Sequence, residues 1–177
     1  MATYVAFSVI WSLGANLHDS CRIIFGSYLK GELASHMSGF PDGDVYEYGV
    51  NPASHRLDTW TKQIPEFNFN PEQNFFDVLV PTSDTVKYSF LLNTLLNAGA
   101  NVLLMGETGV GKSVIIKDFL MNAPENLMSA FVNFSGKTST KNMTDSVEGN
   151  LDAIRKNKLQ PKAGKKMVFF VDDVNMP

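Results

Sequence analysis

The chain has 177 residues, of which 44% are hydrophobic and 19% are charged, so its composition is that of a globular protein and excludes a disordered one. Its net charge of −3 gives no electrostatic reason to expect binding to nucleic acid or anionic lipid, so we expect neither a nucleic acid nor a membrane as a partner. The single cysteine, Cys21, excludes an internal disulfide and fits a reducing compartment, and no apolar run approaches the ~20 residues that cross a bilayer.

The first third of the chain predicts two helices. Apolar residues recur at three- and four-residue spacing from Tyr4 to Leu13, which predicts a helix over about residues 3–16. This stretch lacks the basic start and the small-x-small cleavage site of a signal peptide, so we interpret it as a core-facing helix. Asp19 is the predicted N-cap of a second helix that runs to Leu33.

An irregular insert follows these helices. SGFPDGD (38–44) has the glycine and proline content of a loop. VYEYGV and HRLDTW alternate as two short strands of a hairpin-like insert would, and NFNPEQNF is again loop-like. These changes of pattern divide the chain into a helical segment (1–37), a connecting insert with short strands (38–74) and a further domain (75–177).

From residue 75 onwards, strand-like apolar runs alternate with helical patterns. The predicted strands are FFDVLVP (75–81), NVLLM (101–105), SAFVNF (129–134) and MVFFV (167–171). The predicted helices cover about 85–97, 113–121 and 142–157. Thr82, Ser83 and Asp84 offer N-caps for the first of these helices, and Gly99 terminates it. Because buried strands that alternate with helices indicate parallel βαβ units, the predicted fold class is α/β.

A phosphate-binding motif follows NVLLM directly. It reads Gly106-Glu107-Thr108-Gly109-Val110-Gly111-Lys112-Ser113 and precedes an apolar helical pattern. This is G-x-x-x-x-G-K-[ST] in the strand–loop–helix context that the motif requires. The glycines let the backbone wrap closely around phosphate, with its N–H groups forming an anion nest at a helix N-terminus. We therefore predict that the octapeptide binds nucleotide, with Lys112 contacting the β- and γ-phosphates and Ser113 offering its hydroxyl to Mg²⁺. The alternative is that the octapeptide is a glycine-rich surface turn.

Two adjacent acids end the last predicted strand. A phosphate-loop protein needs a carboxylate that holds Mg²⁺ through water at the end of another buried strand, and MVFFVDD supplies one. Asp172 is the predicted metal-side acid, and Asp173 lies where a base would orient the attacking water. Asp173 is one methylene shorter than the glutamate usual at this position. The alternative is that these acids cap a helix or lie in a solvated loop.

Three segments together resemble one family. GETGVGKSV, FVNFSGKTST and AGKKMVFFVDDVNMP look like an AAA+ module of dynein heavy chains, and the DDVNMP ending is most similar to the third of six modules in axonemal dyneins. FSVIWSLGANL and DSCRIIFGSYLK are similar to the helical tail of the preceding, second module. The resemblance implies an incomplete P-loop NTPase (AAA+) three-layer α/β core, preceded by a helical segment and a short β insert.

The resemblance also implies a function and further site residues. It implies a module that binds ATP or ADP with Mg²⁺ and acts as an ATPase in an intact ciliary or flagellar motor, in the cytoplasm and on the cytoskeleton of the axoneme. Its partners would be the rest of the heavy-chain ring and, through the full-length protein, intermediate chains, light chains and microtubules. Val80, Pro81 and Thr82 would border the adenine, and Asn133 with Ser135 would lie near the γ-phosphate side.

In this family, a further strand lies between the phosphate-loop strand and the Asp-Asp strand and follows both in sequence. We therefore expect a gap in the sheet, with unpaired backbone groups on both sides of it, and expect the isolated 177-residue chain to be unstable or aggregation-prone, and inactive.

Three functions fit these observations. The first is a motor ATPase module, the second is a regulatory nucleotide-binding module with little or no hydrolysis, and the third is an unrelated P-loop enzyme such as a small-molecule kinase. A kinase needs a lid with clustered arginines, whereas Arg22, Arg56 and Arg155 lie far apart in the sequence. The three histidines and Cys21 have no metal-binding spacing.

Overall fold

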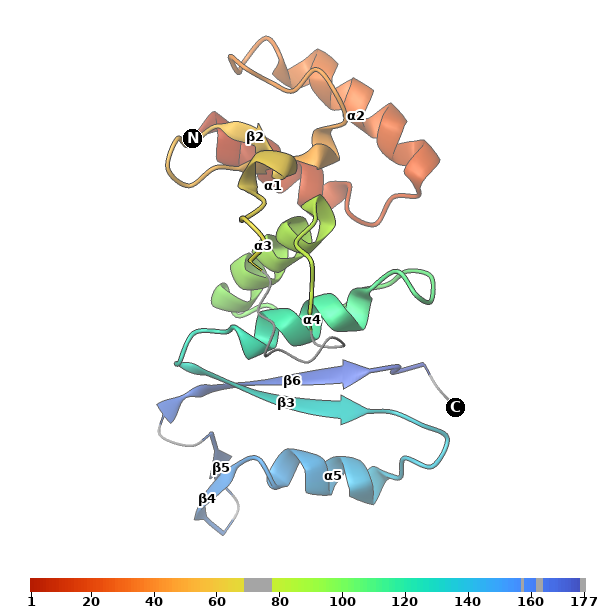
Figure 1. Cartoon of the computed structure of the whole chain (residues 1–177), viewed down its shortest axis with the longest axis vertical. Coiled ribbons are helices and arrows are strands. Elements are labelled where there is room, and N and C mark those ends of the chain that lie inside the picture. Colours follow the sequence, from red (N-terminus) through yellow and green to blue (C-terminus); the bar gives the residue numbers. More distant parts are fainter. Residues whose placement is uncertain (69–77, 157, 162–163, 176–177) are drawn as a thin grey trace. The chain divides into compact units, whose positions relative to one another are not determined.

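The computed structural model describes residues 1–68, 78–156, 158–161 and 164–175 (Figure 1). It divides into two compact units, 1–102 and 103–177. In the described residues, no helix is long and apolar enough to cross a membrane.

The first unit begins with the two predicted helices. They are α1 (Ala2–Leu13) and α2 (Asp19–Leu33). The predicted cap of α2 is wrong by one residue, because His18 is the N-cap and its ring accepts the N–H of Ser20. Asp19 is instead the first helical residue, where its negative charge favours the positive end of the helix dipole.

The hairpin-like insert is confirmed, but it is shorter than the sequence predicts. Val45–Glu47 forms the 3-10 helix η1, capped by the side chain of Asp44. Strands β1 (Tyr48–Val50) and β2 (Leu57–Thr59) then pair antiparallel. A second 3-10 helix, η2 (Trp60–Gln63), follows β2.

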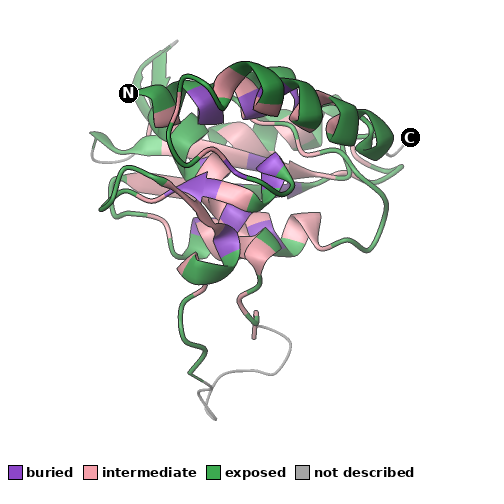
Figure 2. Ribbon diagram, turned by 90° about the horizontal axis from the view of Figure 1, so that it is seen from above, coloured by how far each residue is buried: buried purple, intermediate pink, exposed green. Residues whose placement is uncertain are grey.

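Aromatic side chains form the core of the first unit. Trp60 is fully buried, and its indole N–H donates to the carbonyl oxygen of Tyr46 over 3.0 Å. Phe7 and Phe90 lie against the Trp60 ring with centroids 6.3 and 5.5 Å away. A Cβ atom on Gly49 would stand 2.3 Å from this ring, so only glycine fits there. The buried residues are coloured purple in Figure 2.

Helix α3 (Ser83–Asn97) closes the first unit. Thr82 caps it in a reciprocal capping box with Thr85, and Gly99 follows its end with φ +78°, so both predicted helix signals are confirmed. The strand predicted over 75–81 is wrong where it can be judged: residues 75–77 lie outside the described residues, and 78–81 belong to no strand.

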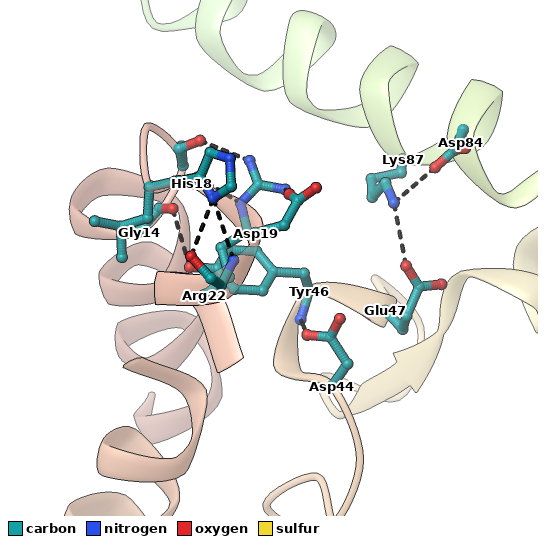
Figure 3. A network of polar contacts seen from close by, with 12 residues as sticks. Gly14, His18, Asp19, Arg22, Asp44, Tyr46, Glu47, Asp84 and Lys87 are labelled. Carbon is teal, nitrogen blue, oxygen red and sulfur yellow. Dashed lines mark hydrogen bonds and ion pairs between the residues drawn. The ribbon is translucent and has the colours of Figure 1, made fainter. Parts of the chain in front are cut away.

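An ion triad ties α3 to η1. The ammonium of Lys87 lies 2.7 Å from Asp84 Oδ1 and 3.3 Å from Glu47 Oε1 (Figure 3). The Lys87 side chain is 8% exposed, whereas those of Glu47 and Asp84 are 49% and 65% exposed. Burial alone lowers the pKa of Lys87, but the hydrogen bonds and charges of Asp84 and Glu47 outweigh it, and the pKa ends above its ordinary value.

The second unit is built around one parallel strand pair. Its elements are α4 (Lys112–Met121), β3 (Leu127–Asn133), α5 (Thr140–Glu148), β4 (Asp152–Arg155), β5 (Lys158–Gln160) and β6 (Lys166–Asp172). Strands β3 and β6 pair in parallel, from Leu127 opposite Lys166 to Asn133 opposite Asp172. Figure 1 draws α4 on one side of this pair and α5 on the other, as in an α/β layer.

The helix predicted over 142–157 is wrong in its second half. Helix α5 ends at Glu148, followed by Gly149 as C-cap. Strands β4 and β5 then form an antiparallel hairpin. Glycine is a poor helix former, and it ends the helix before the next apolar residues, which belong to the hairpin.

The prediction of a strand at NVLLM (101–105) is also wrong. Residues 101–105 belong to no strand, and among the described residues β6 pairs with β3 alone. Leu103 and Met105 are 71% and 78% exposed, while Val102 and Leu104 are half-buried, so exposure alternates as in an extended segment with one uncovered side. A strand exists only through a hydrogen-bonded neighbour, and none of the described residues supplies one.

Candidate functional site

The phosphate-binding motif forms a glycine-dependent loop at the start of α4. Gly109 and Gly111 both have φ +87°, a backbone conformation that other residues rarely adopt. A Cβ atom on either would meet nothing within 4 Å, so backbone conformation and not crowding requires glycine there. Gly106 has no positive φ, and a Cβ on it would meet only side-chain atoms of Lys112 and Val110 at 3.7 Å.

The N-terminus of α4 suits an anion. Gly111 is its N-cap and provides no side chain, and the first turn contains no acidic residue. The first N–H groups of a helix have no partner within the helix, and the helix dipole adds positive potential at this end. Loop and helix start together therefore present backbone donors to a phosphate. Glu107, Thr108 and Val110 are exposed in the loop between the glycines.

Lys112 folds back over the loop. Its ammonium donates to the carbonyl oxygens of Gly106 over 3.0 Å and Glu107 over 2.6 Å. These two bonds fix the long side chain above the loop backbone. An ammonium held there is a positive charge beside the loop backbone, and its predicted contact with the β- and γ-phosphates stays a prediction.

The two sequence motifs meet through one short hydrogen bond. The hydroxyl of Ser113 donates to Asp172 Oδ1 over 2.7 Å. Ser113 is the second residue of α4, and Asp172 is the last residue of β6, where the N–H of Phe134 also binds the Asp172 carbonyl over 3.1 Å. The bond joins residues 59 positions apart in the sequence.

This pair of groups fits a magnesium ion. A hydroxyl and a carboxylate are the hard oxygen ligands that Mg²⁺ takes, and Mg²⁺ keeps several waters and substrate phosphates instead of an all-protein cage. Among the described residues, no group of three or more acidic, histidine or cysteine side chains converges on one point. Ser113 and Asp172 would hold the ion, and its chemistry would be charge neutralisation on the phosphates.

Lys117 belongs to this site, although the sequence analysis did not include it. Its ammonium lies 3.8 Å from Asp172 Oδ2. Lys117 follows Ser113 by four residues on α4, so both side chains project from one face of the helix. That spacing was the signal available in the sequence.

Asp173 lies apart from these contacts. It has φ +53°, is exposed, and makes no side-chain hydrogen bond or ion pair with any residue that the structure describes. A non-glycine residue in this region is uncommon, although aspartate tolerates it better than most. The backbone therefore turns sharply immediately after the metal-side acid.

The structure places two further sets of predicted contact residues differently. Asn133 is directly opposite Asp172 in the parallel ladder. Ser135 begins a turn in which its backbone N–H donates to Thr138 Oγ1 over 2.9 Å. Val80, Pro81 and Thr82 are in the first unit, where Thr82 caps α3. Their place beside an adenine stays a prediction.

Comparisons with known proteins match almost the whole chain. Residues 67–177 match the P-loop containing dynein motor region, and residues 1–62 match the dynein heavy chain AAA lid domain. Dynein axonemal heavy chain 6 of Homo sapiens is 38% identical over 175 residues. The dynein-1-beta heavy chain of the flagellar inner arm I1 complex of Chlamydomonas reinhardtii is 36% identical over 174 residues. Each alignment covers 97% of this chain and 4% of the relative, so the chain spans a small part of the length of the relatives it matches.

Proposed function

Because the chain belongs to the dynein heavy chain family, we propose that it contributes a nucleotide-binding AAA+ module to a microtubule motor that drives ciliary or flagellar movement. The family supports nucleotide binding at the phosphate loop, and ATP or ADP with Mg²⁺ is the proposed ligand. The proposed setting is the axoneme, with the rest of the heavy-chain ring, intermediate and light chains, and microtubules as partners. The proposed module begins at residue 75, after a helical tail (1–37) and an insert (38–74). This family membership replaces the alternative of an unrelated P-loop kinase.

The 2.7 Å bond between Ser113 and Asp172 is the observation that carries the proposal. It brings the hydroxyl of the phosphate loop to the acid at the end of a parallel strand. In the proposed site the loop N–H groups and Lys112 bind the phosphates, and Ser113 and Asp172 orient the magnesium ion.

Replacing the loop lysine tests nucleotide binding. The experiment uses the intact heavy chain with the phosphate-loop lysines of its other nucleotide sites substituted, and measures the affinity for a fluorescent ATP analogue. Lys112→Ala should lower the affinity at least ~100-fold, because a charge-assisted contact to phosphate is lost. Lys141→Ala is the control, because Lys141 is an exposed lysine on α5. Retained affinity in Lys112→Ala would exclude nucleotide binding by this loop.

A second candidate function is a regulatory site with little or no hydrolysis. The exposure of Asp173 and its lack of described partners favour it, because a general base is held within reach of its water by its surroundings. Asp173→Asn separates the two functions. Asparagine tolerates positive φ as aspartate does, so the change removes the charge and keeps the turn. Reduced turnover at this site alone would support a catalytic Asp173, and unchanged turnover would support the regulatory function.

A further inference from the structure

Resting on the proposed function, we propose that Lys117 is a positioning residue that acts as the counter-cation of Asp172, so that Mg²⁺ binds this site in competition with a built-in ammonium. The proposal concerns how strongly Mg²⁺ and nucleotide support each other's binding. It predicts that removing the Lys117 charge strengthens this coupling.

The geometry assigns one partner to each oxygen of Asp172. Ser113 donates to Oδ1 at 2.7 Å, and the Lys117 ammonium lies 3.8 Å from Oδ2. Both partners come from successive turns of α4, so the rigid helix sets their separation. The Asp172 side chain is 19% exposed, which makes its charge less screened than that of a surface acid.

Lys112 is not the counter-cation of Asp172. Its ammonium is bonded to the carbonyl oxygens of Gly106 and Glu107. Among the described residues, Lys117 is the cation that forms an ion pair with Asp172.

Lys117 contributes little to folding through this contact. The distance is near the limit of an ion pair, and the Lys117 side chain is 43% exposed, conditions under which surface pairs add almost nothing to stability. Its effect on a second cation is different, because a fixed positive charge beside a metal-side acid repels Mg²⁺ whether or not the pair stabilises the fold.

The measured quantity is the coupling factor between Mg²⁺ and nucleotide. It is the affinity for N-methylanthraniloyl-ADP with Mg²⁺ divided by the affinity in EDTA. Because Mg²⁺ would bind this site together with the nucleotide phosphates, the ratio reports how strongly the nucleotide complex holds Mg²⁺. The protein is the intact heavy chain with the phosphate-loop lysines of its other nucleotide sites substituted. Because exposed charge pairs are weak but Mg²⁺ is divalent, Lys117→Met should raise the coupling factor about three- to tenfold.

Two further variants separate charge from side-chain structure. Lys117→Arg keeps the positive charge, so its coupling factor should stay within about twofold of the parent value. Lys62→Met is the matched control, because Lys62 forms an ion pair of the same 3.8 Å length with Asp58, an acid outside the site. This variant should leave the coupling factor unchanged.

An unchanged or lowered coupling factor in Lys117→Met overturns the proposal, as does an equal rise in Lys117→Arg. A parent protein whose affinity for the probe does not depend on Mg²⁺ also overturns it. A parent protein that does not bind the probe at all contradicts the proposed function itself, so the two failures are distinguishable.

Discussion

The Lys87 triad predicts an asymmetry between two ways of breaking the same ion pairs. Lys87→Met removes a buried charge and leaves Glu47 and Asp84, whose side chains are 49% and 65% exposed and solvated. Methionine is unbranched and fits the space of the lysine stem, so the free energy of unfolding should change by less than about 1 kcal/mol. The double variant Glu47→Gln, Asp84→Asn instead leaves an ammonium that is 8% exposed without a carboxylate, which should cost about 2–4 kcal/mol.

Hydrogen exchange of the α3 amides in the intact heavy chain measures this asymmetry as a local opening free energy. Lys30→Met is the control, because the Lys30–Asp42 pair is short at 2.8 Å but its side chains are 44% and 96% exposed, so its loss should leave the protection of α3 unchanged. If Lys87→Met lowers protection of α3 as much as the double variant does, burial does not decide the energetics of the triad.

Three other outcomes are expected. Because the pKa of Lys87 is raised, the contribution of Lys87 to stability is complete below the ordinary lysine value of 10.5 and is lost at higher pH. The hydrogen-exchange protection of α3 should therefore fall above that pH in the parent protein and not in Lys87→Met. An equal fall in both proteins would contradict this. Gly111→Ala should weaken nucleotide binding about five- to thirtyfold, because a positive φ costs alanine ~1–2 kcal/mol. Gly106→Ala should weaken binding less, because Gly106 has no positive φ. Equal losses of affinity in a binding titration would count against this backbone argument. Gly49→Ala should destabilise the first unit by about 1–3 kcal/mol, because the added methyl group overpacks against Trp60, and hydrogen exchange should show lower protection. Gly31→Ala on α2 is the control, because a Cβ atom there meets nothing within 4 Å, and it should not lower protection.

The sequence predicted the contacts that depend on local chemistry. The phosphate loop and its helix follow from glycines and a lysine at fixed spacing, and Asp172 follows from its place at the end of an apolar run. These signals are sufficient because the carboxyl ends of parallel strands lie at one sheet edge, where such loops also lie. The α3 cap at Thr82 was predictable for the same reason, since hydroxyl side chains bind the free N–H groups of the first turn.

The errors arise where a structure depends on distant residues. NVLLM has the composition of a buried strand, but a strand requires a partner, and composition does not say whether one is present. Residues 149–157 carry apolar residues that fit either a helix or a hairpin, and Gly149 decides in favour of the hairpin. Lys117 was missed because its role depends on an acid that the fold brings to α4 from β6.

The parallel pairing of β3 with β6 gives the two sides of the proposed site different dependence on the rest of the chain. The loop from Gly106 to Ser113 and the first turns of α4 need only neighbouring residues, and helical turns form within about a microsecond. Asp172 reaches Ser113 only after β3 and β6 have paired across the intervening α5 and the β4–β5 hairpin, a non-local step that is intrinsically slower. The phosphate side of the proposed site therefore depends on local contacts, whereas its metal side depends on one non-local strand pairing.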